Sequence, residues 1–182
     1  NYSSGSDFVK DSVEIADDDI YFPDYDAVVA IHSGPGGESS GNSNDIWSAH
    51  WPTLKISTDD EDEDGNEHFV DGISQVPEYQ LSNGERNPLG VWCHEFGHEL
   101  GLPDYYDTDG SSEGVGNWAV MAAGSWGNNG ETPVYFSAYS RYWLGWDEPT
   151  LVQGDIANLV IEPVSEGGKI YKLPIPGNWT DS

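Results

Sequence analysis

Positively charged side chains are scarce in this sequence of 182 residues, which holds six Lys and Arg against 33 Asp and Glu. The formal net charge of −27 repels the phosphates of nucleic acids and of anionic membranes, so neither is expected as a partner. Long apolar runs are missing as well, and none approaches the about 20 residues of a membrane-spanning helix, which excludes membrane insertion. The single cysteine, Cys93, excludes an internal disulfide.

What remains is an acidic surface that attracts cations. An acidic, Lys-poor surface stays hydrated in concentrated salt, which is typical of a halophilic source, although an acidic secreted protein from an ordinary source would look similar. The chain opens on polar residues and shows no signal peptide. We therefore expect either a cytoplasmic protein or a processed piece of a longer precursor.

Aromatic residues are plentiful, with eight Trp, ten Tyr and five Phe, so the chain can bury a core of one domain's size. Apolar spacing predicts helices over 6–17 and 137–144, a buried strand over 26–32, hairpin strands over 53–57 and 67–74, and short strands after 149. The Gly-rich segment 33–44 lacks the Gly-Lys-Ser/Thr ending of a phosphate-binding loop. These elements predict a single α+β domain with a small, twisted, mixed β-sheet.

The clearest helix is predicted over 87–101, and it carries the sequence His-Glu-Phe-Gly-His at 94–98. Residues four apart share one helical face, so the imidazoles of His94 and His98 can bind one ion. Glu95 projects beside that ion rather than onto it. This position suits a general base that deprotonates a metal-bound water.

The residues after this helix extend the motif. Gly101 can adopt a left-handed conformation without a Cβ penalty, which ends the helix and turns the chain back toward the ion. Pro103 prevents the helix from resuming. Asp104 can then supply a third ligand oxygen and leave a fourth position for water, which is the arrangement of a catalytic zinc rather than a structural one.

The segment from His94 to Asp107 resembles the active-site segment of the immune inhibitor A family of secreted metallopeptidases, relatives of the metzincins whose third ligand is Asp. The resemblance covers most of the chain, including 25–36, 45–48, 77–79, 117–121 and 144–146. It implies a metzincin-like fold with an active-site helix, a Met-turn and a C-terminal helix. In this resemblance Met121 matches the methionine of the turn beneath the zinc. The acidic insert at 59–67 departs from the family pattern.

The resemblance also implies a secreted zinc endopeptidase that is made as a precursor with a propeptide. We expect residues 1–150 to form the catalytic domain and 151–182 to form C-terminal strands that start a following β module. We expect protein or peptide substrates to bind in extended form along a sheet edge. Glu95 takes the proton during attack on the carbonyl and passes it to the leaving amine. Tyr135 or Tyr139 could assist at the oxyanion, and the sequence does not choose between them.

The proposed ligands have plainer alternatives. His94 and His98 could be ordinary histidines at the edge of the core. The protein could also be an inactive relative that keeps the zinc, although the presence of Glu95 argues against this. Asp104 could cap the next turn while a downstream carboxylate, such as Glu113, completes the site, but the segment around Glu113 is typical of a loop.

The single methionine and the other histidines fit structural roles too. On chemistry alone, Met121 fits core packing as well as it fits the turn. His32 and His50 fit packing or capping near strand ends. The competing function for the whole chain is a calcium-dependent surface or adhesion module that keeps the fold without the activity.

Two acidic segments have the spacing of calcium sites. Residues 60–71 copy a calcium-binding loop, but Glu67 stands where such loops have an apolar residue and no helices flank the segment, so a solvated hairpin tip is favoured. Asp107, Asp109 and Glu113 directly follow the motif and resemble a stretch typical of the family. A calcium ion there would tie down a loop with few apolar anchors.

Overall fold

The structure, a computed structural model, describes residues 5–80 and 89–174. It contains two compact units, Asn1–Val134 and Tyr135–Ser182. The first unit contains the motif helix and every residue of the cleft described below. The division into domains at residue 150 stays a prediction.

The first unit combines a mixed sheet with short helices. In chain order its elements are α1 (Gly5–Ala16), η1 (Phe22–Asp24), β1 (Val28–Pro35), α2 (Gly37–Ser40), β2 (Ala49–Glu61), β3 (Glu67–Tyr79), α3 (Leu89–Glu99), η2 (Gly116–Trp118) and η3 (Ala123–Trp126). The predicted helix over 6–17, the hairpin and the body of the motif helix are confirmed. The first turn of that helix, predicted at 87–88, lies outside the described residues.

The sheet is mixed, as predicted, with the order β1-β3-β2 among the described strands. Strands β1 and β3 run parallel, with Val28 opposite Ile73. Strands β2 and β3 run antiparallel, with His50 opposite Ser74. Strand β2 is therefore an outer strand of this sheet, and its first residues are available to line a cleft.

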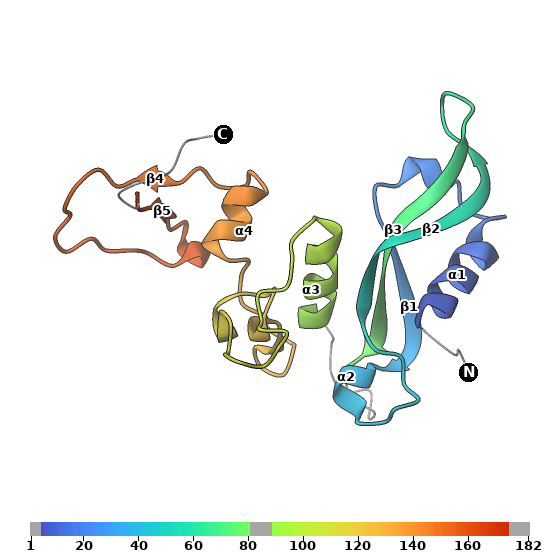
Figure 1. Ribbon diagram of the computed structural model, residues 1–182, viewed down its shortest axis with the longest axis horizontal. Helices are drawn as coiled ribbons and strands as arrows, with labels where there is room; N and C mark the ends of the chain where they lie inside the picture. The colour runs from blue at the N-terminus through green and yellow to red at the C-terminus, as the bar shows by residue number, and fades with distance from the viewer. Residues whose placement is uncertain (1–4, 81–88, 175–182) are drawn as a thin grey trace. The chain divides into compact units, whose positions relative to one another are not determined.

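Alternation along β3 assigns the two faces of the sheet to two helices. Ile73 belongs to the apolar cluster that includes Val9 and Val13 of α1. The next residue, Ser74, points to the other face, and its hydroxyl donates a hydrogen bond to the backbone carbonyl of Glu95 in α3 at 3.2 Å. Helices α1 and α3 thus lie on opposite faces of the sheet (Figure 1).

The main apolar core lies between α1 and the sheet. Its buried members are Val9, Val13, Phe22, Ala30, Ile56, Val70 and Ile73. Burial of such side chains contributes about 1.5–3 kcal/mol each to folding. The core therefore stabilises the sheet from the face opposite α3, and this sheet in turn supports α3 and the cleft.

Strand β1 differs from the prediction of a continuously buried strand, which is wrong. Ala30 and His32 are buried on the α1 face, but Val29 and Ile31 are 38% and 53% exposed on the other face. The reason is the position of α3, which contacts β3 and β2. An apolar run shows that a strand can be buried on both faces, but it does not show which neighbours cover it.

The acidic segment between β2 and β3 forms a hairpin tip, as favoured from the sequence. The carboxylate of Asp62 accepts hydrogen bonds from the backbone N–H groups of Asp64 and Asn66. The Asn66 side-chain amide donates to the same carboxylate, and these bonds lower the pKa of Asp62. Hydrogen bonds within the tip thus stabilise its turn.

The second unit contains α4 (Ala138–Trp143), β4 (Thr150–Leu151), η4 (Val164–Glu166) and β5 (Tyr171–Lys172). Ser137 caps α4, with its hydroxyl accepting from the Ser140 N–H at 3.1 Å. Strands β4 and β5 form a parallel pair. The predicted helix over 137–144 and the short strands after 149 are confirmed. No helix among the described residues of either unit is long and apolar enough to cross a membrane.

Candidate active site

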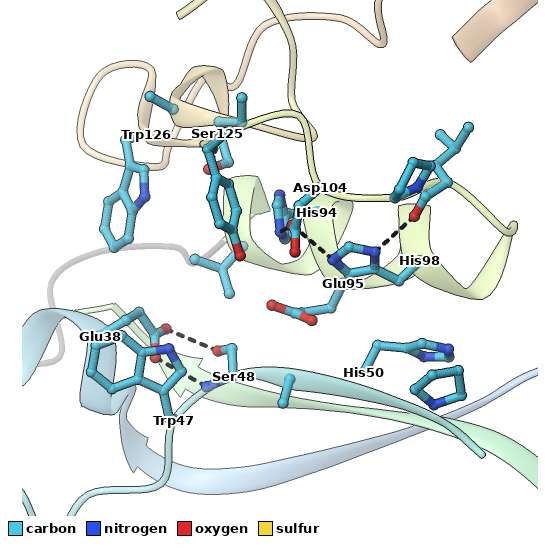
Figure 2. A pocket seen from close by; sticks show the side chains of 18 of the residues that line it. Glu38, Trp47, Ser48, His50, His94, Glu95, His98, Asp104, Ser125 and Trp126 are labelled. Atoms are coloured by element: carbon cyan, nitrogen blue, oxygen red, sulfur yellow. Dashed lines mark hydrogen bonds and ion pairs between the residues drawn. The ribbon is translucent and has the colours of Figure 1, made fainter. Parts of the chain in front are cut away.

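Helix α3 and the turn after it bring three possible metal ligands together. The ligand atoms of His94, His98 and Asp104 all lie within 4.8 Å of one another. The Nε2 atoms of His94 and His98 lie 3.1 and 3.2 Å from the same oxygen, Oδ1 of Asp104. Figure 2 shows the three side chains converging above the cleft. This grouping was predicted from the spacing, and Glu113, the alternative third ligand, does not belong to it.

The end of α3 explains why Asp104 reaches the histidines. Gly101 has φ of +86°, and its N–H donates to the His98 carbonyl at 2.9 Å. The Leu102 N–H donates to the Gly97 carbonyl at 3.0 Å. This pair of bonds is the Schellman ending of a helix, which requires a left-handed residue and reverses the chain. The reversal carries Asp104 back over the helix face that bears both histidines.

The hydrogen bonds of the two rings fix which nitrogen carries the proton. His94 Nδ1 lies 2.9 Å from the Val120 carbonyl, and His98 Nδ1 lies 2.8 Å from the Leu102 carbonyl. A carbonyl oxygen can only accept, so each Nδ1 carries the hydrogen. In a neutral imidazole, Nε2 then presents a lone pair. Burial lowers the pKa of His98, which favours that neutral form.

Three electron-pair donors therefore face one another at the site. Oδ1 of Asp104 is buried and, among the described residues, receives no hydrogen bond. When both rings are neutral, two Nε2 lone pairs point at this oxygen, and neither ring can donate a hydrogen bond to it. Nitrogen and carboxylate ligands of this kind, held by hydrogen bonds to their far side, are typical of zinc sites. The residues present fit a divalent cation.

The segment around Met121 frames these ligands from the other side. Its neighbour Val120 supplies the carbonyl that holds His94. The Met121 carbonyl accepts the N–H of Tyr105, the residue after Asp104, at 2.7 Å. The Met121 side chain is fully buried. The backbone of this segment thus fixes two of the three ligands, while the role of the Met121 thioether beneath a metal stays a prediction.

Glu95 lies on the cleft side of α3, with its carboxylate directed into the space between the helix and β2 (Figure 2). The residue is 7% exposed. Burial raises the pKa of Glu95 to about 8, and the negative charges of Asp104 and Glu38 add to the shift. A cation held by the neighbouring ligands would oppose this shift, because it stabilises the ionised carboxylate.

The cleft has a volume of about 910 Å³ and separates α3 from the start of β2. It is lined by Glu38, Trp47, Ser48, Ala49, His50, Pro52, Val91, His94, Glu95, His98, Gly101, Leu102, Pro103, Asp104, Tyr106, Ala122, Ala123, Ser125 and Trp126. Gly90 lets the η3 segment approach α3, since a Cβ there would overlap the Ser125 carbonyl. A trough of this size can accept several residues of an extended chain.

Tyr106 is a cleft residue that was not recognised in the sequence. Tyr106 stacks on the His94 ring, with centroids 6.1 Å apart. Burial and a hydrogen bond to Asp104 raise the pKa of Tyr106 to about 12. Its position two residues after the third ligand was the signal that could have identified it. The earlier candidates, Tyr135 and Tyr139, belong to the second unit, and their role stays a prediction.

His50 is the other residue whose place in the cleft was missed. It lies at the start of β2, as expected for a packing residue, and its Nδ1 is 3.1 Å from Ser74 Oγ and 3.2 Å from Glu99 Oε2. Its ring lies 6.1 Å from that of His98. No sequence pattern links His50 to the motif, because only the register of β2 on β3 brings it there.

In the segment 107–113, the aspartate carboxylates accept hydrogen bonds from donors of the same segment. The Asp107 carboxylate accepts from the N–H groups of Asp109 and Ser112 and from the Ser111 hydroxyl. Asp109 accepts from the Ser111 N–H, and Glu113 is exposed. Among the described residues, these acids do not form a group of potential metal ligands. Calcium binding by Asp107, Asp109 and Glu113 stays a prediction.

Comparisons with known proteins agree with the expected resemblance. Residues 11–147 match the family described as immune inhibitor A peptidase M6, catalytic domain. Immune inhibitor A of Bacillus thuringiensis subsp. alesti is 32% identical over 142 residues, which cover 74% of this chain and 20% of that protein. The pre-pro-metalloprotease PrtV of Vibrio cholerae serotype O1 strain M66-2 is 31% identical over 136 residues, which cover 65% of this chain and 14% of that protein. The chain thus spans a fifth or less of the length of these relatives.

Proposed function

The chain belongs to the immune inhibitor A peptidase family, and from this premise we propose that it is a zinc-dependent endopeptidase with Glu95 as its general base. The observation that carries the proposal is the convergence of the His94 and His98 Nε2 atoms on Asp104 Oδ1. Both Nδ1 atoms are occupied by backbone carbonyls, so the ring nitrogens that remain are free to bind a cation.

His94, His98 and Asp104 would hold the metal. Three protein ligands of the types N, N and O are typical of catalytic zinc sites. When bound, a zinc ion supplies Lewis acidity, which makes water a stronger acid and a carbonyl group a better electrophile. The protein's own residues then fix the tautomer of each ligand, bind the substrate and move the protons.

Glu95 handles the protons. Its carboxylate is buried beside the ligand group and opens into the cleft. It accepts a proton from the attacking water and delivers this proton to the nitrogen of the leaving amine.

The substrate is a protein or peptide in extended form. Ala49, His50 and Pro52 line the cleft at the start of the outer strand β2, so backbone groups of this strand are placed to bond an extended chain. Pro52 has no N–H and removes one donor from that edge. Tyr106 lies beside His94 in the same cleft, and its hydroxyl, which bonds to Asp104 in this structure, would have to turn away from Asp104 to donate a hydrogen bond to the developing oxyanion.

Secretion and a propeptide belong to the same proposal. The name of the Vibrio relative describes a pre-pro-metalloprotease, which is a precursor with segments removed in maturation. An extracellular enzyme activated from a precursor is the corresponding expectation for the protein that contains this chain. The calcium-dependent adhesion module considered from the sequence is not favoured, because the cleft keeps Glu95 and all three ligands.

Metal analysis and hydrolysis of casein test the proposal together. The purified, processed protein is expected to bind one zinc ion per chain and to cleave casein, with loss of activity on chelation and recovery with zinc. Glu95→Gln should keep the zinc and lower kcat by about 10²–10⁴-fold. A protein that binds zinc and cleaves no protein or peptide at low or high salt would contradict the enzyme assignment.

A further inference from the structure

A third carboxylate lines the cleft besides those of Glu95 and Asp104, and the proposed mechanism gives it no task. It belongs to Glu38 in the short helix α2 (Gly37–Ser40). Figure 2 shows it across the cleft from α3, on the side of Trp47 and Ser48. It therefore faces the same space as the general base from a different element.

The Glu38 carboxylate is held in place by Ser48. The Ser48 N–H donates to Oε2 at 3.1 Å, and the Ser48 hydroxyl donates to Oε1 at 2.9 Å. Ser48 is 6% exposed, so both donors are themselves well fixed. One buried residue therefore fixes both oxygens of the Glu38 carboxylate.

Gly36 makes room for this arrangement. A Cβ at position 36 would overlap both oxygens of the Glu38 carboxylate. The backbone of Gly36 has φ of −70° and ψ of 138°, which any residue can adopt. A side chain at position 36 would therefore displace the Glu38 carboxylate from its present position, because that carboxylate folds back over the Gly36 Cα.

Two indole rings line the cleft with Glu38. Trp47 is 63% exposed and Trp126 is 41% exposed, and both belong to the cleft lining. In the view of Figure 2 they lie toward the same end as Glu38. The face of a Trp ring attracts cations, and the guanidinium of Arg can also stack on it.

The charges of the cleft are of one sign. Among the described residues that line it, there is no Lys or Arg, whereas there are three carboxylates. In the proposed enzyme Asp104 faces a metal ion and Glu95 exchanges a proton. Glu38 is left as a fixed negative charge that no basic residue of the lining neutralises.

We propose that Glu38, Trp47 and Trp126 form a subsite that binds a cationic side chain of the substrate, Arg or Lys, next to the bond that is cut. The inference rests on the proposed peptidase function and adds a substrate preference to it. A guanidinium can bond to the carboxylate through charge-assisted hydrogen bonds while it stacks on an indole, so Arg is bound more tightly than Lys.

Peptides that differ at one side chain test this preference. N-acetylated, internally quenched peptides carry Arg, Lys, citrulline, Leu or Glu at each position near the cut in turn. The zinc-loaded protein is expected to show a kcat/KM about tenfold higher for Arg than for citrulline at one position. Acetylation removes the other source of a cationic group, the peptide's N-terminal amine. A preference that appears only with free N-termini would overturn the assignment to a side chain.

The Glu38→Gln variant separates the role of the charge from a structural role. It keeps the shape of the side chain, and the Arg-to-citrulline ratio should fall from about tenfold toward one. Glu78→Gln is the matched control, because Glu78 also accepts a backbone N–H, from Gly34, but is exposed and does not line the cleft. It should leave the ratio unchanged. A ratio that survives Glu38→Gln, or equal losses for both peptides, would overturn the proposal.

Binding provides a readout that does not depend on activity. The Arg peptide is titrated calorimetrically into the zinc-loaded Glu95→Gln variant, with and without Glu38→Gln. We expect the second substitution to weaken binding about tenfold, and added salt to reduce the difference. If the wild-type protein cleaves neither casein nor any peptide, the peptidase assignment fails, while this titration still decides whether Glu38 binds a cationic side chain.

Discussion

Two acidic segments lie a few residues apart after α3, and they use their carboxylates in opposite ways. In the ligand turn, 101–104, Oδ1 of Asp104 faces two ring nitrogens and has no donor among the described residues. In the acidic loop, 107–113, the Asp107 carboxylate is surrounded by donors of its own loop. In the proposed function, the unsatisfied acceptor of the ligand turn, and not acidic composition, marks the cation site.

Replacing the acid in each segment is the strongest test of this contrast. Asp104→Asn should weaken zinc binding about 10³-fold, because it removes the anionic ligand and adds an amide that cannot coordinate equally well. Asp107→Asn should leave zinc affinity unchanged. Competition with a fluorescent zinc chelator measures both. Equal losses in the two variants would show that charge near the site, rather than ligation, controls affinity.

The pH dependence of the zinc-free protein gives the next largest effect. Glu95 has a pKa of about 8 in the folded chain, above the value of about 4.3 in an unfolded one. The folded state therefore holds a proton that the unfolded state has released, and the free energy of unfolding falls by on the order of 5 kcal/mol as pH rises through this window. Urea unfolding in a chelator should show the fall, and Glu95→Gln should flatten it.

Asp107 has the opposite dependence, which sharpens the comparison. Hydrogen bonds from Ser111 and from the backbone of Asp109 lower the pKa of Asp107 in the folded state. Its contribution to stability is present above its unfolded pKa and is lost as pH falls below about 4. Asp107→Asn should flatten the acid side of the same curve and leave the region between pH 5 and 8 as it is.

Each segment contains a glycine with a left-handed backbone, so substitutions of comparable strain can be made in both. Gly101 has φ of +86° and Gly110 has φ of +74°. Alanine at either position should cost about 1 kcal/mol of stability. Only Gly101→Ala should also weaken zinc binding, about tenfold, because it disturbs the turn that positions Asp104. Thermal unfolding and zinc competition on the two variants check this, and a zinc defect in Gly110→Ala would contradict it.

Removing one hydroxyl that bonds to the carboxylate of each segment should give the smallest effects. Tyr106→Phe deletes the hydrogen bond to Asp104 and should weaken zinc binding several-fold. Ser111→Ala deletes a donor to Asp107 and should leave the zinc affinity unchanged. The same competition assay resolves the two variants. A zinc affinity unchanged in Tyr106→Phe would show that this hydroxyl does not orient the ligand.

The features that could be predicted from the sequence are those that residues close together in the chain determine. The spacing of His94 and His98 on a helix, with Gly101 after it, leads directly to the group that the structure brings together with Asp104. Their roles in catalysis remain proposals. The carbonyl of Val120 that holds His94 was not predictable, because the irregular segment that supplies it carries no periodic pattern.

The opposite wall of the cleft was beyond the reach of local patterns. Glu38 and His50 come from α2 and β2, and they meet α3 only through the pairing of strands and the packing of α3 on the sheet. The exposed side of β1 was missed for the same reason, since Val29 and Ile31 are apolar but α3 lies over the other strands. Sequence periodicity describes each element and leaves their mutual arrangement open.

The bond between His94 and the Val120 carbonyl has a practical consequence for redesign. One nitrogen of this ring faces Asp104 in the proposed metal site, and the other bonds an irregular loop to the helix. A substitution of His94 intended to change the preferred metal must therefore also replace the hydrogen bond to the Val120 carbonyl. We expect substitutions of His98 to disturb the structure less, because its Nδ1 bonds to the carbonyl of Leu102, only four residues away, and not to a distant segment.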